Sequence, residues 1–302
     1  MKRSSEIYRS RFEELDLLRG LAIVGMVIYH LLFILNFFGV YGVNLEFSAM
    51  QIFAWIVRFD FLALVGVGMV ISYYRILGKM ENSVSLGRAR WRAILQQWKR
   101  GAMVGGCAMV VTTATYLYVR EDFVRFGILH LIAVSVFFWS FFVERKWLVL
   151  VLALVSFWMG GWFEWMGIGG VDFNGVWMGY FLKDMNWNAQ SVDYFPLFPW
   201  IGMVGMGIFL GHVFYPKGVQ KFEWKILNSE GMVKKSVCFL GRHSLAVYMI
   251  HVPVIMMVLW ALGLVKGGYF GIRKAGDFVA GGSCAFLLRA LYDEVTRLVC
   301  GR

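Results

Sequence analysis

The sequence predicts an all-α protein: a polytopic membrane helix bundle of about seven to eight transmembrane helices. Composition and segment length indicate this class. Of the 302 residues, 59% are hydrophobic and 16% are charged, whereas soluble domains carry about 25% charged residues. The mean hydropathy of +0.64 agrees. Apolar segments also recur at the length of about 20 residues that a helix needs to cross the hydrocarbon core.

The apolar segments predict one membrane domain. We expect an N-terminal segment over 1–16, the transmembrane bundle over 17–263, and a C-terminal segment over 264–302 with room for one further short span. The seven stronger predicted spans are 17–39, 51–74, 101–118, 126–143, 147–167, 197–215 and 238–263, and a weaker eighth is 277–292.

The distribution of basic residues predicts the orientation. With the N-terminus in the cytoplasm, most of the 30 Lys and Arg residues fall on the cytoplasmic side, as the positive-inside rule requires. We therefore expect an integral membrane protein whose partners include membrane lipids, and which could form a homo-oligomer. Nucleic-acid binding is disfavoured, because the basic residues flank apolar spans instead of forming one patch.

The cysteines give no sign of a metal centre. Cys107, Cys238, Cys284 and Cys300 are scattered and show neither a metal-ligand spacing nor a CxxC motif. We therefore expect no zinc site and no disulfide framework.

The first span carries two polar residues on one face. Arg19 and His30 are eleven residues apart, which on an α-helix makes about three turns plus 20° and a rise of about 16 Å. Asp16, Ile23 and Met26 fall on the same stripe. His30 then lies near the middle of the membrane, where an imidazole is energetically costly and indicates function. The alternative is a structural hydrogen bond between helices or an imidazole facing a wet cavity.

Asp60 is the predicted partner of His30. The second span begins near Gln51, so Asp60 lies about 13 Å deep from the other side and reaches a similar depth to His30. A carboxylate beside an imidazole orients it and makes it a better general base. Arg58 falls on roughly the opposite face of that helix and is a candidate for the substrate cavity, although it could instead pair with another helix or extend to the outer surface. The alternative for Arg58 and Asp60 is a structural ion pair.

His130 is a second candidate catalytic residue. It lies early in the fourth predicted span, at a depth of about 10 Å from the outer edge, which suits a catalytic or acceptor-binding group. The alternative is a packing or interfacial histidine. Arg125, close before it, is a candidate for the substrate cavity, although Glu121 is four residues away and could pair with it.

The seventh span begins with a polar face. Ser244, Tyr248 and His251 have i, i+4, i+7 spacing and so share one side of a helix. A polar face within a membrane turns toward other helices or a cavity. We predict that these three residues line the substrate cavity; the alternative is hydrogen bonding that holds the bundle together.

Two loops are candidates for ligand binding. The basic inner loop contains Arg88, Arg90 and Arg92, which would bind the phosphates of a cofactor or, alternatively, lipid headgroups. The outer loop contains Trp177 and Trp187, which would stack on a sugar ring or, alternatively, belong to an ordinary aromatic belt.

Four stretches of the chain are similar to a known enzyme family. They read LDLLRGLAIVGMVIYHLLF, RFGILHLIAVSVFF, DYFPLFPWIGMVGMGIFLG and LGRHSLAVYMIHVPV. Together, over roughly residues 12–260, they resemble the prokaryotic relatives of heparan-α-glucosaminide N-acetyltransferase. Arg19 followed by ten residues and His30 also resembles the signature of the acyltransferase type 3 family.

The resemblance implies an acyltransferase in the plasma membrane of a prokaryote. It would transfer an acyl group, usually acetyl, from cytoplasmic acetyl-CoA or another acyl-CoA to an amino or hydroxyl group of a glycan on the far side. His30 matches the intramembrane histidine of the type 3 family. The sequence departs from that family at Arg88-x-Arg90-x-Arg92, where Arg-x-x-Arg is frequent, and from the lysosomal enzyme around His30. Both His30 and His130 therefore remain candidates.

We interpret the chain as such an acyltransferase. Arg19 and the Arg88–Arg92 segment would hold the CoA phosphates, and His30 would act as general base in direct transfer, with an acyl-histidine intermediate as an alternative. Tyr248 and His251 would line the cavity or stabilise the oxyanion. A proton-coupled transporter could use the same His, Asp and Arg residues, and a membrane scaffold with structural polar contacts is a third possibility.

Overall fold

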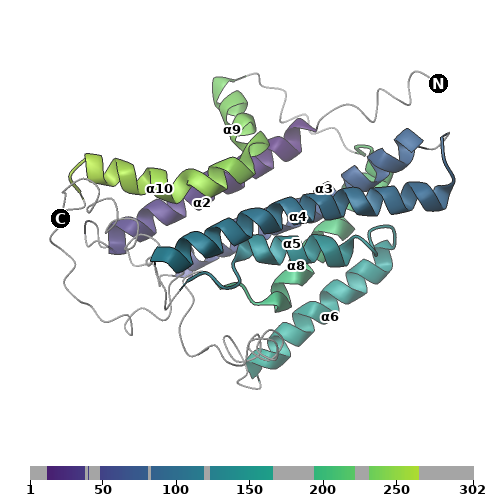
Figure 1. Cartoon of the computed structure of the whole chain (residues 1–302), viewed down its shortest axis with the longest axis horizontal. Helices are drawn as coiled ribbons and strands as arrows, with labels where there is room; N and C mark the ends of the chain where they lie inside the picture. The colour runs from purple at the N-terminus through teal and green to yellow at the C-terminus, as the bar shows by residue number, and fades with distance from the viewer. Residues whose placement is uncertain are drawn as a thin grey trace.

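The computed structural model describes residues 12–37, 40, 48–80, 83–118, 123–165, 194–221 and 231–264. Within these ranges the regular structure is helical, which confirms the predicted all-α class, and the only extended pairing is an isolated bridge between Phe126 and Tyr194. The elements are α2 (Glu13–Phe37), α3 (Ser48–Met80), α4 (Leu86–Tyr118), α5 (Ile128–Trp139), α6 (Lys146–Trp165), α8 (Leu197–Phe214), the 3-10 turn η1 (Pro216–Gly218), α9 (Met232–Arg242) and α10 (Ser244–Ala261) (Figure 1).

Among the described helices, four are long and apolar enough to cross a membrane, and they lie within α2, α3, α8 and α10. They correspond to the first, second, sixth and seventh predicted spans. The molecule is therefore an integral membrane helix bundle. The fourth and fifth predicted spans correspond to the shorter apolar helices α5 and α6. The predicted eighth span and the outer loop with Trp177 and Trp187 lie outside the described residues.

The predicted basic loop is instead part of a helix. Helix α4 begins at Leu86 and continues for 33 residues through the third predicted span. Ala89, Ala93 and Gln97 are buried at i, i+4, i+8, so this segment has a packing face of its own. Gln97 also donates from Nε2 to the Met69 carbonyl of α3, at 3.1 Å. Packing against α3 thus holds the segment in helical conformation.

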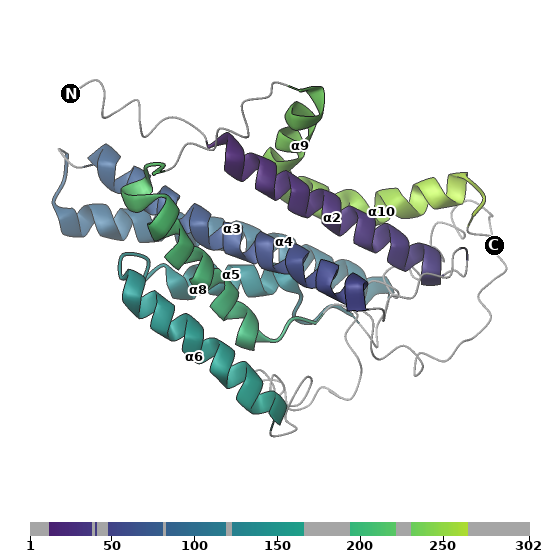
Figure 2. The same ribbon diagram turned by 180° about the vertical axis from the view of Figure 1, so that it is seen from behind.

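The predicted seventh span is also divided. A break at His243, with φ −107° and ψ 24°, separates α9 from α10. Helix α9 projects away from the bundle, and α10 continues beside α2 (Figures 1 and 2). The close approach of Gly241 to the Asp16 backbone fixes α9 against the start of α2, because a Cβ at Gly241 would overlap the Asp16 carbonyl.

The centre of the bundle is a close crossing of α3 and α8. A Cβ at Gly66 would lie 2.6 Å from the Ile208 nitrogen, and a Cβ at Gly207 would overlap the Ala63 carbonyl. Small residues at such crossings let the backbones of membrane helices approach closely. The main apolar core surrounds this crossing and includes Leu62 and the fully buried Trp139.

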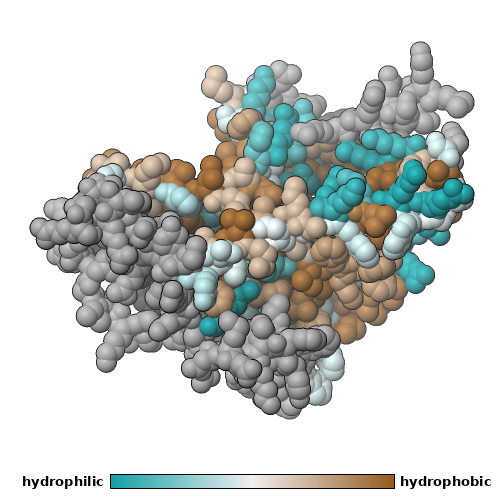
Figure 3. Space-filling view, in the orientation of Figure 1, coloured by the Kyte–Doolittle hydropathy of each residue, from teal (hydrophilic) through white to brown (hydrophobic). Residues whose placement is uncertain are grey.

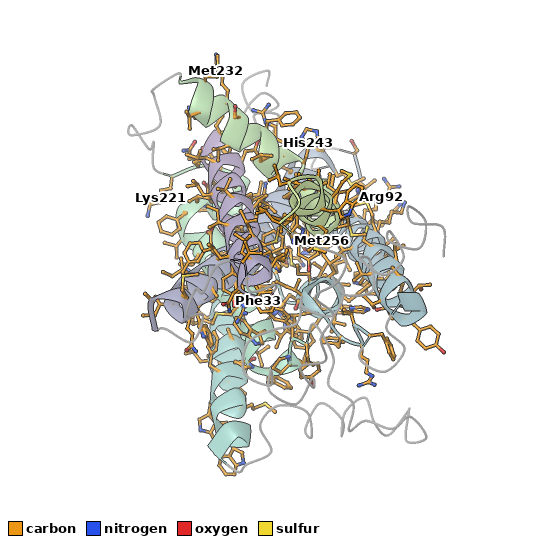
Figure 4. The ribbon with its side chains drawn as sticks, turned by 90° about the vertical axis from the view of Figure 1, so that its left-hand side faces the viewer. Phe33, Arg92, Lys221, Met232, His243 and Met256 are labelled. Carbon is orange, nitrogen blue, oxygen red and sulfur yellow. The ribbon has the colours of Figure 1, made fainter. Side chains whose placement is uncertain are left out.

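A second apolar cluster joins α2 to α10. Ile34 packs with Val252, Ile255, Met256 and Leu259. Viewed from the end of the molecule, α10 lies beside α2, and His243 marks the junction with α9 (Figure 4). The visible surface is hydrophobic over much of the described bundle, and hydrophilic residues gather over the first half of α4 and around α9 (Figure 3). This distribution fits a body embedded in lipid with one polar end.

A histidine pair as the candidate active site

The structure brings His30 of α2 against His251 of α10. Their ring centroids are 4.8 Å apart, and the rings meet edge to face at 76°. His251 is buried, with 8% of its surface exposed, and His30 is half-buried. The apolar cluster between α2 and α10 includes Leu31 and Val252, the residues that follow the two histidines, and holds the helices together at this depth.

Both imidazoles are held in the same way. The Nδ1 atom of His30 lies 2.8 Å from the Met26 carbonyl oxygen, and Nδ1 of His251 lies 2.6 Å from the Tyr248 carbonyl oxygen. A carbonyl oxygen only accepts, so Nδ1 carries the hydrogen in both rings. In a neutral imidazole this leaves a lone pair on Nε2. The Nε2 atom of His251 is buried and has no hydrogen-bond partner among the described residues.

Aromatic and charged groups surround the pair. Tyr29 and Tyr248 contact it, with centroid distances of 5.9 Å from Tyr29 to His30 and 5.5 Å from Tyr248 to His251. Arg58 of α3 acts electrostatically on His30, and its guanidinium carbon lies 5.6 Å from the Phe195 ring centroid. Arg58 is thus close enough to act on the site, where a cation can stabilise developing negative charge.

The structure does not join Asp60 to His30. Asp60 is half-buried, and within the described residues it makes no hydrogen bond or ion pair. The Met26 carbonyl, instead of a carboxylate, orients the His30 ring. A role of Asp60 in catalysis therefore stays a prediction that rests on its depth in the membrane.

His130 has both ring nitrogens engaged in local structure. The Gly127 N–H donates to Nδ1 at 3.2 Å, within the capping box of α5. Nε2 therefore carries the hydrogen and donates to the Thr112 hydroxyl at 3.3 Å, which in turn donates to the Val124 carbonyl at 2.8 Å. This closed chain joins α5 to α4 and leaves no free lone pair on His130. The geometry favours a structural role, and catalysis by His130 stays a prediction.

The predicted donor-binding arginines have different surroundings. Arg19 lies 3.4 Å from Asp16, which also binds Arg242 at 3.1 Å. Arg90 pairs with Glu144 at 3.0 Å. Residues four apart on a helix share a face and residues two apart do not. Arg88 and Arg92 therefore form one exposed stripe of α4, and Arg90 points away from it.

One buried hydrogen bond and one partly exposed ion pair close the same end of the bundle. The Tyr215 hydroxyl donates to Glu14 at 2.9 Å, and Lys234 of α9 binds Glu13 at 3.0 Å. Burial, followed by the hydrogen bond to Glu14, raises the pKa of Tyr215 above its ordinary value. These contacts hold the acidic first turn of α2 against α9 and the end of α8.

The remaining predicted cavity residues do not reach the histidine pair by a described contact. Ser244 is half-buried at the start of α10, and Arg125 lies 5.0 Å from the Phe123 ring centroid. Sequence reasoning placed His251 in the cavity but did not identify it as the partner of His30. Sequence reasoning also did not predict the ion pair between Arg242 and Asp16. The feature that could have indicated it is the position of Arg242, a basic residue just before the polar face of the seventh predicted span.

The fold and the site define a helical membrane protein in which a half-buried histidine of one helix contacts a buried histidine of another. The family described as heparan-alpha-glucosaminide N-acetyltransferase, catalytic, matches residues 11–253. The chain therefore belongs to this family and is a membrane acetyltransferase. No curated protein and no solved structure gives a significant match.

Proposed function

We propose that this protein transfers an acetyl group from acetyl-CoA to an amino or hydroxyl group of a sugar on the opposite side of the membrane, with His30 as general base. Family membership supports the acetyl transfer. The observation that carries the role of His30 is its hydrogen bond to Met26, which leaves Nε2 as the basic nitrogen in a ring that contacts a second imidazole.

The acetyl donor would approach from the polar end of the bundle. Arg88 and Arg92 form an exposed cationic stripe there, which suits phosphate groups. Arg19 is 29% exposed in its side chain and is already paired with Asp16, so it would contact CoA as part of that ion cluster. The positive-inside rule supports a cytoplasmic position for this end, so the donor would be cytoplasmic acetyl-CoA.

The reaction needs one proton to leave the acceptor. The acceptor nitrogen or oxygen attacks the thioester carbon, its proton moves to Nε2 of His30, and the carbon–sulfur bond breaks. Arg58 would stabilise the negative charge that develops on the carbonyl oxygen. Direct transfer requires no covalent enzyme intermediate.

The test uses purified protein in proteoliposomes with isotope-labelled acetyl-CoA inside and glucosamine outside. We expect labelled N-acetylglucosamine outside and a rate about 10²- to 10⁴-fold lower for His30→Asn. Asn keeps a donor for the Met26 carbonyl but has no basic Nε2. His243→Asn is the matched control, because His243 is exposed and also contacts its own helix through Nδ1.

Two results would overturn the proposal. Unmodified glucosamine entering the vesicles with a proton flux, and no acetylated product, would identify a transporter. Wild-type transfer by His30→Asn would show that another group is the base.

A further inference from the structure

The geometry points to a single proton-handling unit formed by both histidines. We propose that His30 takes the proton from the acceptor and that His251 delivers it to the departing CoA thiolate. This inference rests on the proposed function and adds a catalytic role for His251 beyond lining the cavity.

The first support is the matched anchoring of the rings. Each Nδ1–H is bound by a carbonyl of its own helix, Met26 for His30 and Tyr248 for His251. Each ring therefore has Nε2 as its remaining proton-transfer atom. A centroid distance of 4.8 Å brings the rings into contact, and the proposed proton transfer uses this contact.

The second support is the unsatisfied Nε2 of His251. A buried polar atom without a partner costs about 1–3 kcal/mol, and such atoms in native proteins call for an explanation. A role in the reaction explains why this atom is buried and unpaired. His130, to which the geometry gives a structural role, has both ring nitrogens hydrogen-bonded instead.

The charges around the pair limit it to one proton at a time. Among the residues that the structure describes, the titratable and charged groups that act on or contact the pair are Arg58 of α3, Tyr29 of α2 and Tyr248 of α10. Asp60 of α3 makes no described ion pair with either ring. With the Arg58 guanidinium acting on the pair, two imidazolium charges at contact distance would repel strongly. The pair therefore holds at most one proton beyond its two neutral rings.

The proton balance is complete within the site. The acceptor forms a bond to the acyl carbon and releases a proton to Nε2 of His30. The carbon–sulfur bond breaks, and its electron pair stays on sulfur as the thiolate. The proton passes to Nε2 of His251 and then to sulfur, which gives the free thiol and restores two neutral imidazoles.

The kinetic test compares two donors, acetyl-CoA and the acetyl thioester of 4-nitrothiophenol, whose thiolate leaves without a proton. The variants are His251→Asn and His30→Asn, and each Asn keeps the donor to the local carbonyl. With acetyl-CoA we expect at least about a 10²-fold loss in either variant. With the aryl thioester, the loss for His251→Asn should fall below tenfold while that for His30→Asn persists. An equal loss with both donors for His251→Asn would overturn the proposal.

A second measurement does not depend on activity. In ¹⁵N-histidine NMR spectra of the protein in nanodiscs, we expect both neutral rings in the Nδ1–H form. As the pH falls, binding of the first proton should change the ¹⁵N shifts of both histidines over the same pH range. In His251→Asn, His30 should protonate at a higher pH, because the competing ring is absent. Independent titration of the two rings would overturn the shared proton. If this coupling is observed but wild-type protein transfers no acetyl group from either donor, the proposed function fails and the histidine unit stands without it.

Discussion

Replacing Gly207 by Ala should separate the two central helices. A Cβ at Gly207 would overlap the Ala63 backbone of α3. Because the contact is with backbone, no side-chain rotation relieves it, and the helices must move apart. Overpacking of this kind costs about 1–3 kcal/mol, whereas Ala gains about 1 kcal/mol over Gly in a helix. Because the overlap is with backbone, the overpacking penalty should lie near the upper end of its range. After the gain from Ala is subtracted, we expect a net destabilisation of about 1–2 kcal/mol.

Gly106→Ala in α4 is the matched control, because a Cβ at Gly106 meets nothing within 4 Å. It should leave stability unchanged or raise it by up to about 1 kcal/mol. The assay is thermal unfolding of both variants in the same detergent, with tryptophan fluorescence as the probe. A lower midpoint for Gly207→Ala and an equal or higher one for Gly106→Ala is the expected result. Equal midpoints would refute the α3–α8 crossing.

Two substitutions and one labelling experiment test other parts of the structure. Asp16→Asn should lower stability by about 1–3 kcal/mol, because it leaves Arg242 and Arg19 without their buried carboxylate. His130→Ala should lower stability by about 1–3 kcal/mol through loss of two hydrogen bonds and reduce transfer per folded molecule less than tenfold. Burial, followed by the charges of Asp16 and Glu13, raises the pKa of the Cys238 thiol. Since the thiolate is the reactive form, maleimide labelling of Cys238 should be slow at pH 7 and accelerate at higher pH.

A comparison variant or a named result decides each of these predictions. Glu13→Gln removes an ion pair whose carboxylate is 61% exposed and should cost at most about 1 kcal/mol; an equal effect of Asp16→Asn would contradict the buried cluster. For His130→Ala, a rate loss as large as that of His30→Asn would restore His130 as a catalytic candidate. Ser236→Cys introduces an exposed thiol on the same helix as Cys238, and equal labelling rates would disprove the effect of burial.

Hydropathy predicted the membrane class and four spans, because apolar length is a direct physical requirement of the bilayer. Hydropathy could not predict that α4 begins at Leu86, because the first turns of this helix are rich in charged residues, and a polar segment between two spans is read as a loop. The burial of Ala89 and Ala93 against neighbouring helices is what extends the helix. The break at His243 likewise depends on a tertiary contact, between Gly241 and α2.

The candidate site was predicted in part. Helical spacing placed Arg19 and His30 on one face and His251 on the polar face of another helix. Spacing cannot say which faces meet, so depth alone suggested Asp60 as the partner of His30, whereas the structure places His251 there. The difference between His30 and His130 was also hidden, because it depends on which ring nitrogens find local partners.

The most direct test of the account is the single-turnover transfer of labelled acetyl from acetyl-CoA to glucosamine by wild-type protein, His30→Asn and His243→Asn in the same nanodiscs. We predict transfer by the wild type and by His243→Asn, and a rate about 10²- to 10⁴-fold lower for His30→Asn with unchanged folding. Transfer by His30→Asn at the wild-type rate would contradict the central claim that this histidine is the base.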